Sequence, residues 1–190
     1  MTDKEHFYFQ RDTDWYDWLK NNHSTSDGVY LIFYKVDSGI PSMRWEEAVK
    51  VALCFGWIDS TVKSLGGGKR RQYFCRRNQK SVWSALNKRY IKELTSANLM
   101  HESGFAIIEV GKKNGSWTAL DNVEKGVIPQ DLQKEFDQNK LAFKNFQAFA
   151  RSYQKNYLYW IHQAKREATR LKRIEEIIQL CESNKKAKGG

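Results

Sequence analysis

Residues 76–84 are the part of the chain whose residue types best suit the binding of an anion. Guanidinium groups bind carboxylate or phosphate through paired hydrogen bonds, and the free N–H groups at a helix N-terminus also favour anions. Here two arginines and Lys80 precede Ser81, the predicted N-cap of a helix, and Trp83 offers a ring for stacking on a base or sugar. The pattern predicts an anion site without identifying the anion.

Asp59 is the candidate acid of the same site. It ends the apolar run 53–58, so we expect its carboxylate at the margin of the core, where a charge needs partners. The nearby arginines are the expected partners, in a structural ion pair or around a pocket acid, and a turn-capping role for Asp59 is the further alternative. The complete set of candidate ligand-binding residues is Trp57, Asp59, Arg70, Arg71, Arg76, Arg77, Ser81, Trp83, Ser84 and Asn87.

The sequence predicts no catalytic residue, metal site or cofactor. The four histidines are scattered and lack the spacing of metal ligands. Cys54 lies in an apolar run and is expected to be a small core residue. Cys75 precedes two arginines, which would lower its pKa if the thiol were exposed.

The positive charge of the chain is concentrated in one stretch. Residues 60–92 hold ten basic and no acidic side chains, which equals the net charge of +10, and they also include aromatic residues. Such a mixture suits phosphate backbones and stacked bases, although a solvated surface is the common alternative. A second basic stretch, 165–173, follows a helical spacing, and the sequence leaves open whether it shares a face with 63–92.

Length and composition limit the class of protein. A chain of 190 residues with 41% hydrophobic and 28% charged residues predicts a folded protein of one domain or one domain with an appendage. No apolar stretch reaches 18 residues, so we expect no membrane span. The polar N-terminus and three cysteines favour a cytoplasmic location with reduced thiols.

The expected fold is α+β, with a small antiparallel or mixed sheet packed against helices and a mainly helical C-terminal part. We expect an α+β core region over 1–120 and a helical region over 121–190 docked on it, with a disordered tail at 184–190. The predicted strands are 29–35 and a hairpin within 57–76. The predicted helices are 12–22, 43–54, 82–95, 103–112, 129–137, one capped by Asn139, and 153–183.

Several motifs together resemble one known family. They are Trp15-x-x-Trp18-Leu, Ala52-Leu-Cys-Phe-Gly-Trp-Ile-Asp59, Arg76-x-x-x-x-Ser81-x-Trp83-Ser84 and Tyr157-x-x-Trp160-Ile. In this order, over most of residues 15–180, the chain resembles the YdeI/OmpD-associated (OmdA) family, also described as bacteriocin-protection proteins. The family usually has Pro-Arg where this chain has Cys75-Arg76, so the backbone before the anion site is freer here. The resemblance implies stress response or antimicrobial resistance and supplies no reaction.

Three functions remain open from the sequence. The first is a non-enzymatic cytoplasmic stress or resistance protein that binds an anionic small molecule or an acidic protein partner. The second is a nucleic-acid-binding module that uses residues 63–92. The third is an enzyme whose pocket is lined by Asp59 and residues 76–84, which requires Asp59 to face a cavity. The oligomeric state is not predicted.

Overall fold

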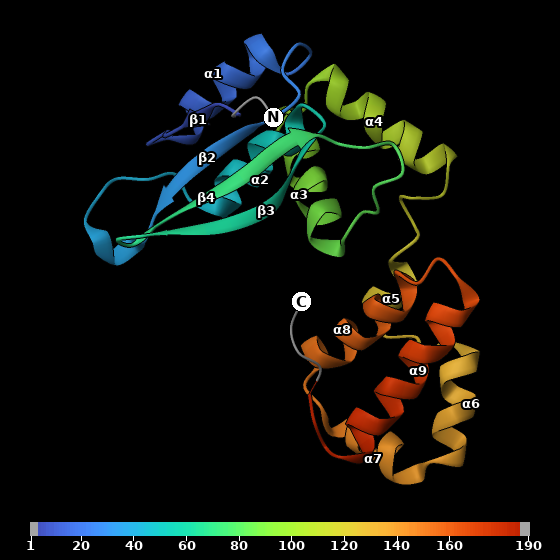
Figure 1. The fold of residues 1–190 in the computed structure, drawn as a ribbon. Coiled ribbons are helices and arrows are strands. Elements are labelled where there is room, and N and C mark those ends of the chain that lie inside the picture. The colour runs from blue at the N-terminus through green and yellow to red at the C-terminus, as the bar shows by residue number, and fades with distance from the viewer. Residues whose placement is uncertain (1–3, 187–190) are drawn as a thin grey trace. The chain divides into compact units, whose positions relative to one another are not determined.

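The protein consists of two compact units in the computed structural model, which describes residues 4–186 (Figure 1). The first unit is Met1–Thr118 and contains a sheet and helices; the second is Ala119–Gly190 and is helical. The predicted α+β class is confirmed. The tail expected at 184–190 lies partly outside the described residues.

A four-stranded mixed sheet organises the N-terminal unit. Its order is β1-β2-β4-β3, with β1 parallel to β2 and the other neighbours antiparallel. The strands are β1 (His6–Phe7), β2 (Val29–Tyr34), β3 (Trp57–Gly66) and β4 (Lys69–Arg76), and the helices are α1 (Asp12–Asn22), the 3-10 turn η1 (Val36–Ser38), α2 (Trp45–Cys54), α3 (Ala85–Ser96) and α4 (Glu102–Lys113).

The strands alternate between a buried and a more exposed side. In β2, Val29, Leu31 and Phe33 are buried, whereas the residues between them are half-buried. On the buried side, the ring of Trp15 from α1 lies 5.8 Å from that of Phe74. Helix α2 lies behind the strands in Figure 1, and none of the helices described in residues 4–118 covers their other side. Helices therefore cover only one face of the sheet.

Gly28 is required where the chain enters β2. Its φ is +145°, and an added Cβ would lie 2.3 Å from the Tyr73 hydroxyl and 2.8 Å from the Phe74 carbonyl oxygen. Any side chain here would displace β4. The glycine thus sets the close approach of β2 to β4.

Two predicted helix starts differ from the structure. Helix α3 begins three residues later than predicted, because Ser84 rather than Ser81 caps it by accepting a hydrogen bond from Asn87 N at 3.2 Å. Helix α2 begins at Trp45, two residues after the predicted start at 43, and Ser42, just before that predicted start, accepts a hydrogen bond from Tyr34 N instead of capping the helix.

The C-terminal unit packs five helices around an aromatic and aliphatic core. They are α5 (Asp121–Lys125), α6 (Gln130–Gln138), α7 (Lys140–Ala148), α8 (Arg151–His162) and α9 (Glu167–Glu182). The predicted cap Asn139 is confirmed, since its side chain accepts a hydrogen bond from Ala142 N at 3.0 Å. The fully buried residues of the C-terminal unit include Leu132, Phe136, Tyr157, Ile161 and Ile177. None of the helices within residues 4–186 has the length and hydropathy needed to span a bilayer.

The single long helix predicted over 153–183 is wrong. The chain forms α8 and α9, and Arg166 between them is extended, with φ −112° and ψ 140°. A continuous helix of that length would extend for about 45 Å. The break lets Ile161 of α8 and Ile174 of α9 be buried in one compact unit, which the uninterrupted hydrophobic spacing does not indicate.

Candidate functional site

The two tryptophans of the predicted site belong to the core. Trp57 is fully buried and donates a hydrogen bond from Nε1 to the His23 carbonyl at 3.1 Å. Trp83 is 2% exposed and packs against Trp117, with ring centroids 5.1 Å apart. Neither offers a free ring for stacking, so their contribution is to stability.

The carboxylate of Asp59 has different partners from those expected. Its Oδ2 accepts hydrogen bonds from Trp45 Nε1 at 2.9 Å and from Gln72 Nε2. The prediction of an arginine ion pair for Asp59 is therefore wrong. Strand alternation explains this, because Asp59 pairs across β3 and β4 with Phe74 and shares its helix-covered side with Gln72.

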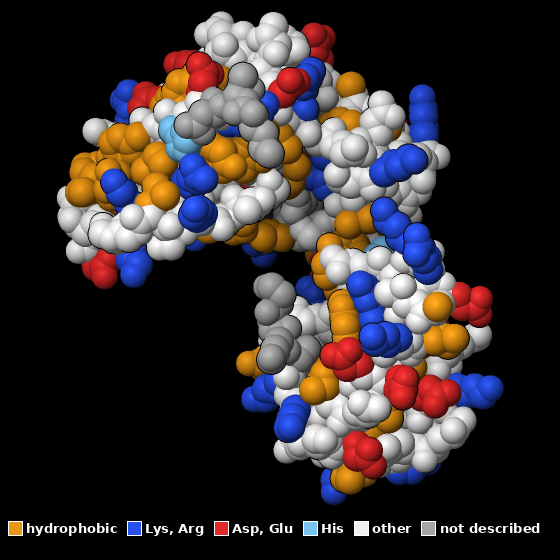
Figure 2. Space-filling model, viewed as in Figure 1, with side chains coloured by type: hydrophobic (Ala, Val, Ile, Leu, Met, Phe, Trp, Pro, Cys, Tyr) orange, Lys and Arg blue, Asp and Glu red, His pale blue; other side chains and the backbone are white. Residues whose placement is uncertain are grey.

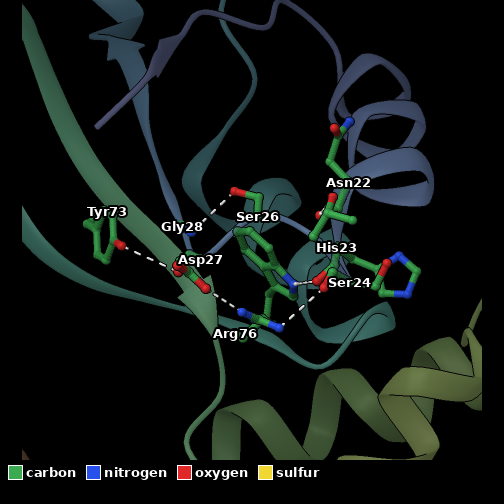
Figure 3. A network of polar contacts seen from close by, with 10 residues as sticks. Asn22, His23, Ser24, Ser26, Asp27, Gly28, Tyr73 and Arg76 are labelled. Carbon is green, nitrogen blue, oxygen red and sulfur yellow. Dashed lines mark hydrogen bonds and ion pairs between the residues drawn. The ribbon is translucent and has the colours of Figure 1, made fainter. Parts of the chain in front are cut away.

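Arg76 is engaged in an ion pair (Figure 3). It extends from the end of β4 to the loop between α1 and β2, where it contacts Asp27 Oδ1 and donates to the Ser24 carbonyl at 3.3 Å. The Tyr73 hydroxyl donates to the Asp27 carbonyl at 3.5 Å in the same network. Arg76 thus fastens this loop to the sheet.

Arg77 is buried beneath the surface expected to bind an anion. Its guanidinium lies over the Trp83 ring, 3.6 Å from the centroid, and donates to the Val82 carbonyl. Its Nε and Nη1 have no hydrogen-bond partner among the described residues. Burial lowers the pKa of Arg77 to about 10, and the charge of Asp59 opposes this change.

The polar residues after Arg77 serve local structure. Ser81 N closes a turn by donating to the Asn78 carbonyl at 2.9 Å. Ser84 caps α3, and its hydroxyl donates to Asn87 Oδ1 at 2.5 Å. The structure therefore does not gather the predicted residues of 76–84 into one open pocket.

Arg70 and Arg71 are neighbours on β4 whose side chains lie on opposite faces. Arg70 is opposite Phe33 in the register, on the helix-covered side, and its guanidinium lies 5.6 Å from the Phe33 ring centroid. Arg71 is opposite Ile32, on the side that no helix of this unit covers. The basic segment is thus divided between two surfaces.

The surface containing Arg71 is an aromatic and cationic layer that we call the open face. Its centre is Tyr30, whose ring stacks with His6 at 4.9 Å, approaches Tyr73 at 5.0 Å and lies 4.4 Å below the Arg71 guanidinium. Arg71 Nη1 also lies 2.8 Å from His6 Nε2. By strand register and contact, the open face comprises His6, Tyr8, Tyr30, Ile32, Tyr34, Ile58, Lys63, Lys69, Arg71, Tyr73 and Cys75.

No acidic side chain is among the residues of the open face within the described range 4–186. Its residues are partly or fully exposed, and they include three cations, Lys63, Lys69 and Arg71. Figure 2 looks onto this side of the sheet and shows hydrophobic side chains, a colour class that includes tyrosine, gathered with Lys and Arg over the N-terminal unit. Acidic side chains lie toward its margin.

The aromatic residues that β1 and β2 add to this face were not among the candidates predicted from the sequence. The stretch Val29–Tyr34 is apolar or aromatic at every position, so its two sides are hard to distinguish. The signal was the spacing of Tyr30 and Tyr34, four residues apart and hence on one side of a strand. Pairing of β2 with β4 then adds Tyr73 and Arg71, which local sequence cannot show.

The reactive thiol suggested at position 75 is not supported. Cys75 is half-buried on the open face, and burial raises its pKa despite the nearby Lys4. Burial raises the pKa of Cys54 and of Cys181 to about 12. All three thiols are therefore less acidic than an ordinary cysteine.

The buried thiols predict a loss of stability at alkaline pH. The folded pKa of Cys54 is raised from 9.0 to about 12, so its stabilising contribution is complete below pH 9 and is lost as the pH rises from 9 toward 12. We expect the free energy of unfolding to fall by up to about 1.4 kcal/mol per pH unit for each such thiol. Urea unfolding at about pH 8 and pH 10 measures this slope. In Cys54→Ala, the dependence of the unfolding free energy on pH should be smaller by the contribution of about one proton. An unchanged dependence in that variant would contradict the raised pKa of Cys54.

Two arginines of the second basic stretch, 165–173, make contacts within the C-terminal unit. Arg170 of α9 binds Asp131 of α6 through two hydrogen bonds, 2.5 and 2.9 Å, and the contact lowers the pKa of Asp131. Arg173 donates to the Trp160 carbonyl and lies 5.3 Å from its ring centroid. These arginines secure α9 and do not form a free basic stripe.

Two family models match the chain, in different parts. One is described as a domain of unknown function (DUF8412) and matches residues 7–107. The other is described as Bacteriocin-protection, YdeI or OmpD-Associated (OmdA) and matches residues 125–184. No curated protein and no solved structure matches. The resemblance predicted from the sequence is thus confirmed in the C-terminal unit. The chain therefore belongs to the DUF8412 family, whose model matches more than half of its length, and its C-terminal unit is similar to the YdeI/OmpD-associated family over residues 125–184.

Proposed function

We propose that the N-terminal unit binds single-stranded nucleic acid on the open face of its sheet. The observation that carries this proposal is the contact of Tyr30 with His6, Tyr73 and Arg71, on a face whose described residues include no acidic side chain. Aromatic rings that stack with bases and cations that attract phosphates are the two elements of such sites.

The shape of the face favours single strands over duplexes. Aromatic side chains on a sheet can stack with bases only when those bases are unpaired. A duplex would offer its phosphates to Arg71, Lys63 and Lys69 but would hide the base faces from Tyr30 and Tyr73. A protruding helix or two-stranded ribbon is the usual means of reading a duplex in its major groove, and the open face presents neither.

The family match suggests a biological setting for this binding. The description of the C-terminal match names bacteriocin protection, and we extend the proposal to a non-enzymatic cytoplasmic role in stress or antimicrobial resistance. Cell fractionation and survival of a deletion strain under bacteriocin challenge test that extension. A membrane-bound or exported protein, or unchanged survival, would remove it without affecting the binding proposal.

Binding to labelled oligonucleotides tests the proposal. We expect single-stranded DNA or RNA of about 20 nucleotides to bind more tightly than the matching duplex in fluorescence anisotropy. Three phosphate contacts imply that raising salt from about 50 to about 200 mM weakens binding roughly 20-fold. The proposal is overturned if no binding occurs at the lower salt concentration, or if the duplex binds at least as tightly.

A further inference from the structure

A cavity lies on the opposite, helix-covered side of the sheet, at the end distant from Trp57. Its volume is about 930 Å³, within the range of small-molecule sites. It is open to solvent on one side and is lined by the end of β2 with η1, the start of α2, and the tip of the β3–β4 hairpin. Its lining residues are Phe33, Tyr34, Lys35, Val36, Asp37, Met43, Arg44, Trp45, Val62, Ser64, Gly66, Gly67, Gly68, Lys69 and Arg70.

The charged part of the lining is strongly cationic. Lys35, Arg44, Lys69 and Arg70 are opposed by a single acid, Asp37. None of the four cations forms an ion pair with another residue in the described range 4–186. Unneutralised cations around a concave surface concentrate anions there, and the two guanidinium groups can bind a carboxylate or phosphate bidentately.

The uncharged part of the lining is apolar. Phe33 and Met43 are buried, and the half-buried Trp45 is fixed by its hydrogen bond to Asp59. At the rim, Val62 is 49% exposed and Val36 is 74% exposed. A ligand that covered these two valines would remove their apolar surface from water, which favours binding.

We propose that this cavity binds an anionic amphiphile, a small molecule with a carboxylate or phosphate group and an apolar ring or chain. The head group would be held by Arg44 and Arg70, and the apolar part would lie against Met43, Trp45 and Val62. An inorganic anion would leave the apolar surface uncovered, and a neutral apolar molecule would leave the cations uncompensated.

This site and the open face share Tyr34 and Lys69 at the end of β2 and the start of β4, but Arg70 belongs to the cavity alone and Arg71 to the open face alone, so the two proposals are tested separately through these arginines. Arg70 and Arg71 are consecutive on β4, and exchange of either by glutamine removes one charge from one face only. Arg70→Gln and Arg71→Gln are therefore matched controls for each other. Val62→Trp adds a second variant at an exposed position, where the larger side chain would occupy the cavity without disturbing the core.

The probe is 8-anilinonaphthalene-1-sulfonate, an anionic aromatic fluorophore, with the neutral N-phenyl-1-naphthylamine as its control. We expect saturable 1:1 binding of the anionic probe, weakened about 10-fold by Arg70→Gln, lost in Val62→Trp, and changed less than twofold by Arg71→Gln. Decanoate and decyl phosphate should displace it, and inorganic phosphate should not. Non-saturable fluorescence, equal binding of the neutral probe, or unchanged binding in both Arg70→Gln and Val62→Trp would overturn the proposal.

Discussion

The double variant Tyr30→Leu/Arg71→Gln is expected to bind single-stranded oligonucleotides about 100-fold more weakly than the natural chain. Base stacking on an aromatic ring contributes about 1–3 kcal/mol per base. Tyr30 contacts His6, Tyr73 and Arg71 at the centre of the open face, so its loss should disturb several stacking positions at once. Arg71→Gln also removes one phosphate contact, which should reduce the dependence of binding on salt.

A matched double variant separates this effect from a general loss of charge or aromatic surface. Arg70→Gln removes an equal charge from the other face of the same strand, and Tyr159→Leu removes an exposed ring in the C-terminal unit. We expect the Arg70→Gln/Tyr159→Leu variant to bind oligonucleotides within about threefold of the natural chain at the same salt concentration. Equal losses in the two double variants, with unchanged circular dichroism, would contradict a localised open-face site.

Gly104→Ala is expected to destabilise the N-terminal unit by about 2 kcal/mol or more, although alanine favours helices. In α4 an added Cβ would lie 2.2 Å from the Cys54 carbonyl oxygen and 2.9 Å from its carbon. His101 N and the Ser103 hydroxyl bind the carbonyls of Cys54 and Phe55, at 3.1 and 3.2 Å, and hold the helix at this distance. The backbone must therefore separate, and overpacking of this kind outweighs the roughly 1 kcal/mol gained in helix propensity.

Thermal unfolding measures this effect. A loss of about 2 kcal/mol corresponds to a fall in Tm of about 10 °C for a unit of this size. Ala106→Gly, at an exposed position of α4, is the control and should cost about 1 kcal/mol through helix propensity alone. A Gly104→Ala protein with equal or higher Tm would show that α4 does not contact the end of α2 as described.

Local sequence signals predicted most elements of this fold. Residues 12–22 and 103–112 have helical spacing, and Asn139 has a capping side chain at the right position, so these elements appear where expected. The hairpin predicted within 57–76 also forms, and its turn lies at the glycines 66–68. The break at 163–166 was not predictable in this way, because packing of α8 against α9 decides it rather than any glycine or proline.

The candidate site was less predictable than the fold. By residue type alone, Arg70, Arg71, Arg76 and Arg77 form one group. In the structure, Arg70 and Arg71 lie on opposite faces of β4. Arg76 pairs with Asp27, and Arg77 is buried over Trp83. Tyr30 and Tyr73 of the open face lie more than 40 residues apart in the sequence, and only the pairing of β2 with β4 brings them together. Long-range pairing is the information that residue types and spacing lack.

Crosslinking of 4-thiouridine-containing RNA to the full chain, followed by mass spectrometry of the modified peptides, tests the central claim most directly. The open-face proposal predicts crosslinks within residues 4–8, 29–34 and 69–76, the segments that carry His6, Tyr30 and Tyr73. These crosslinks should decline together as salt is raised. Crosslinks confined to residues 165–173, or distributed evenly over both units, would contradict it.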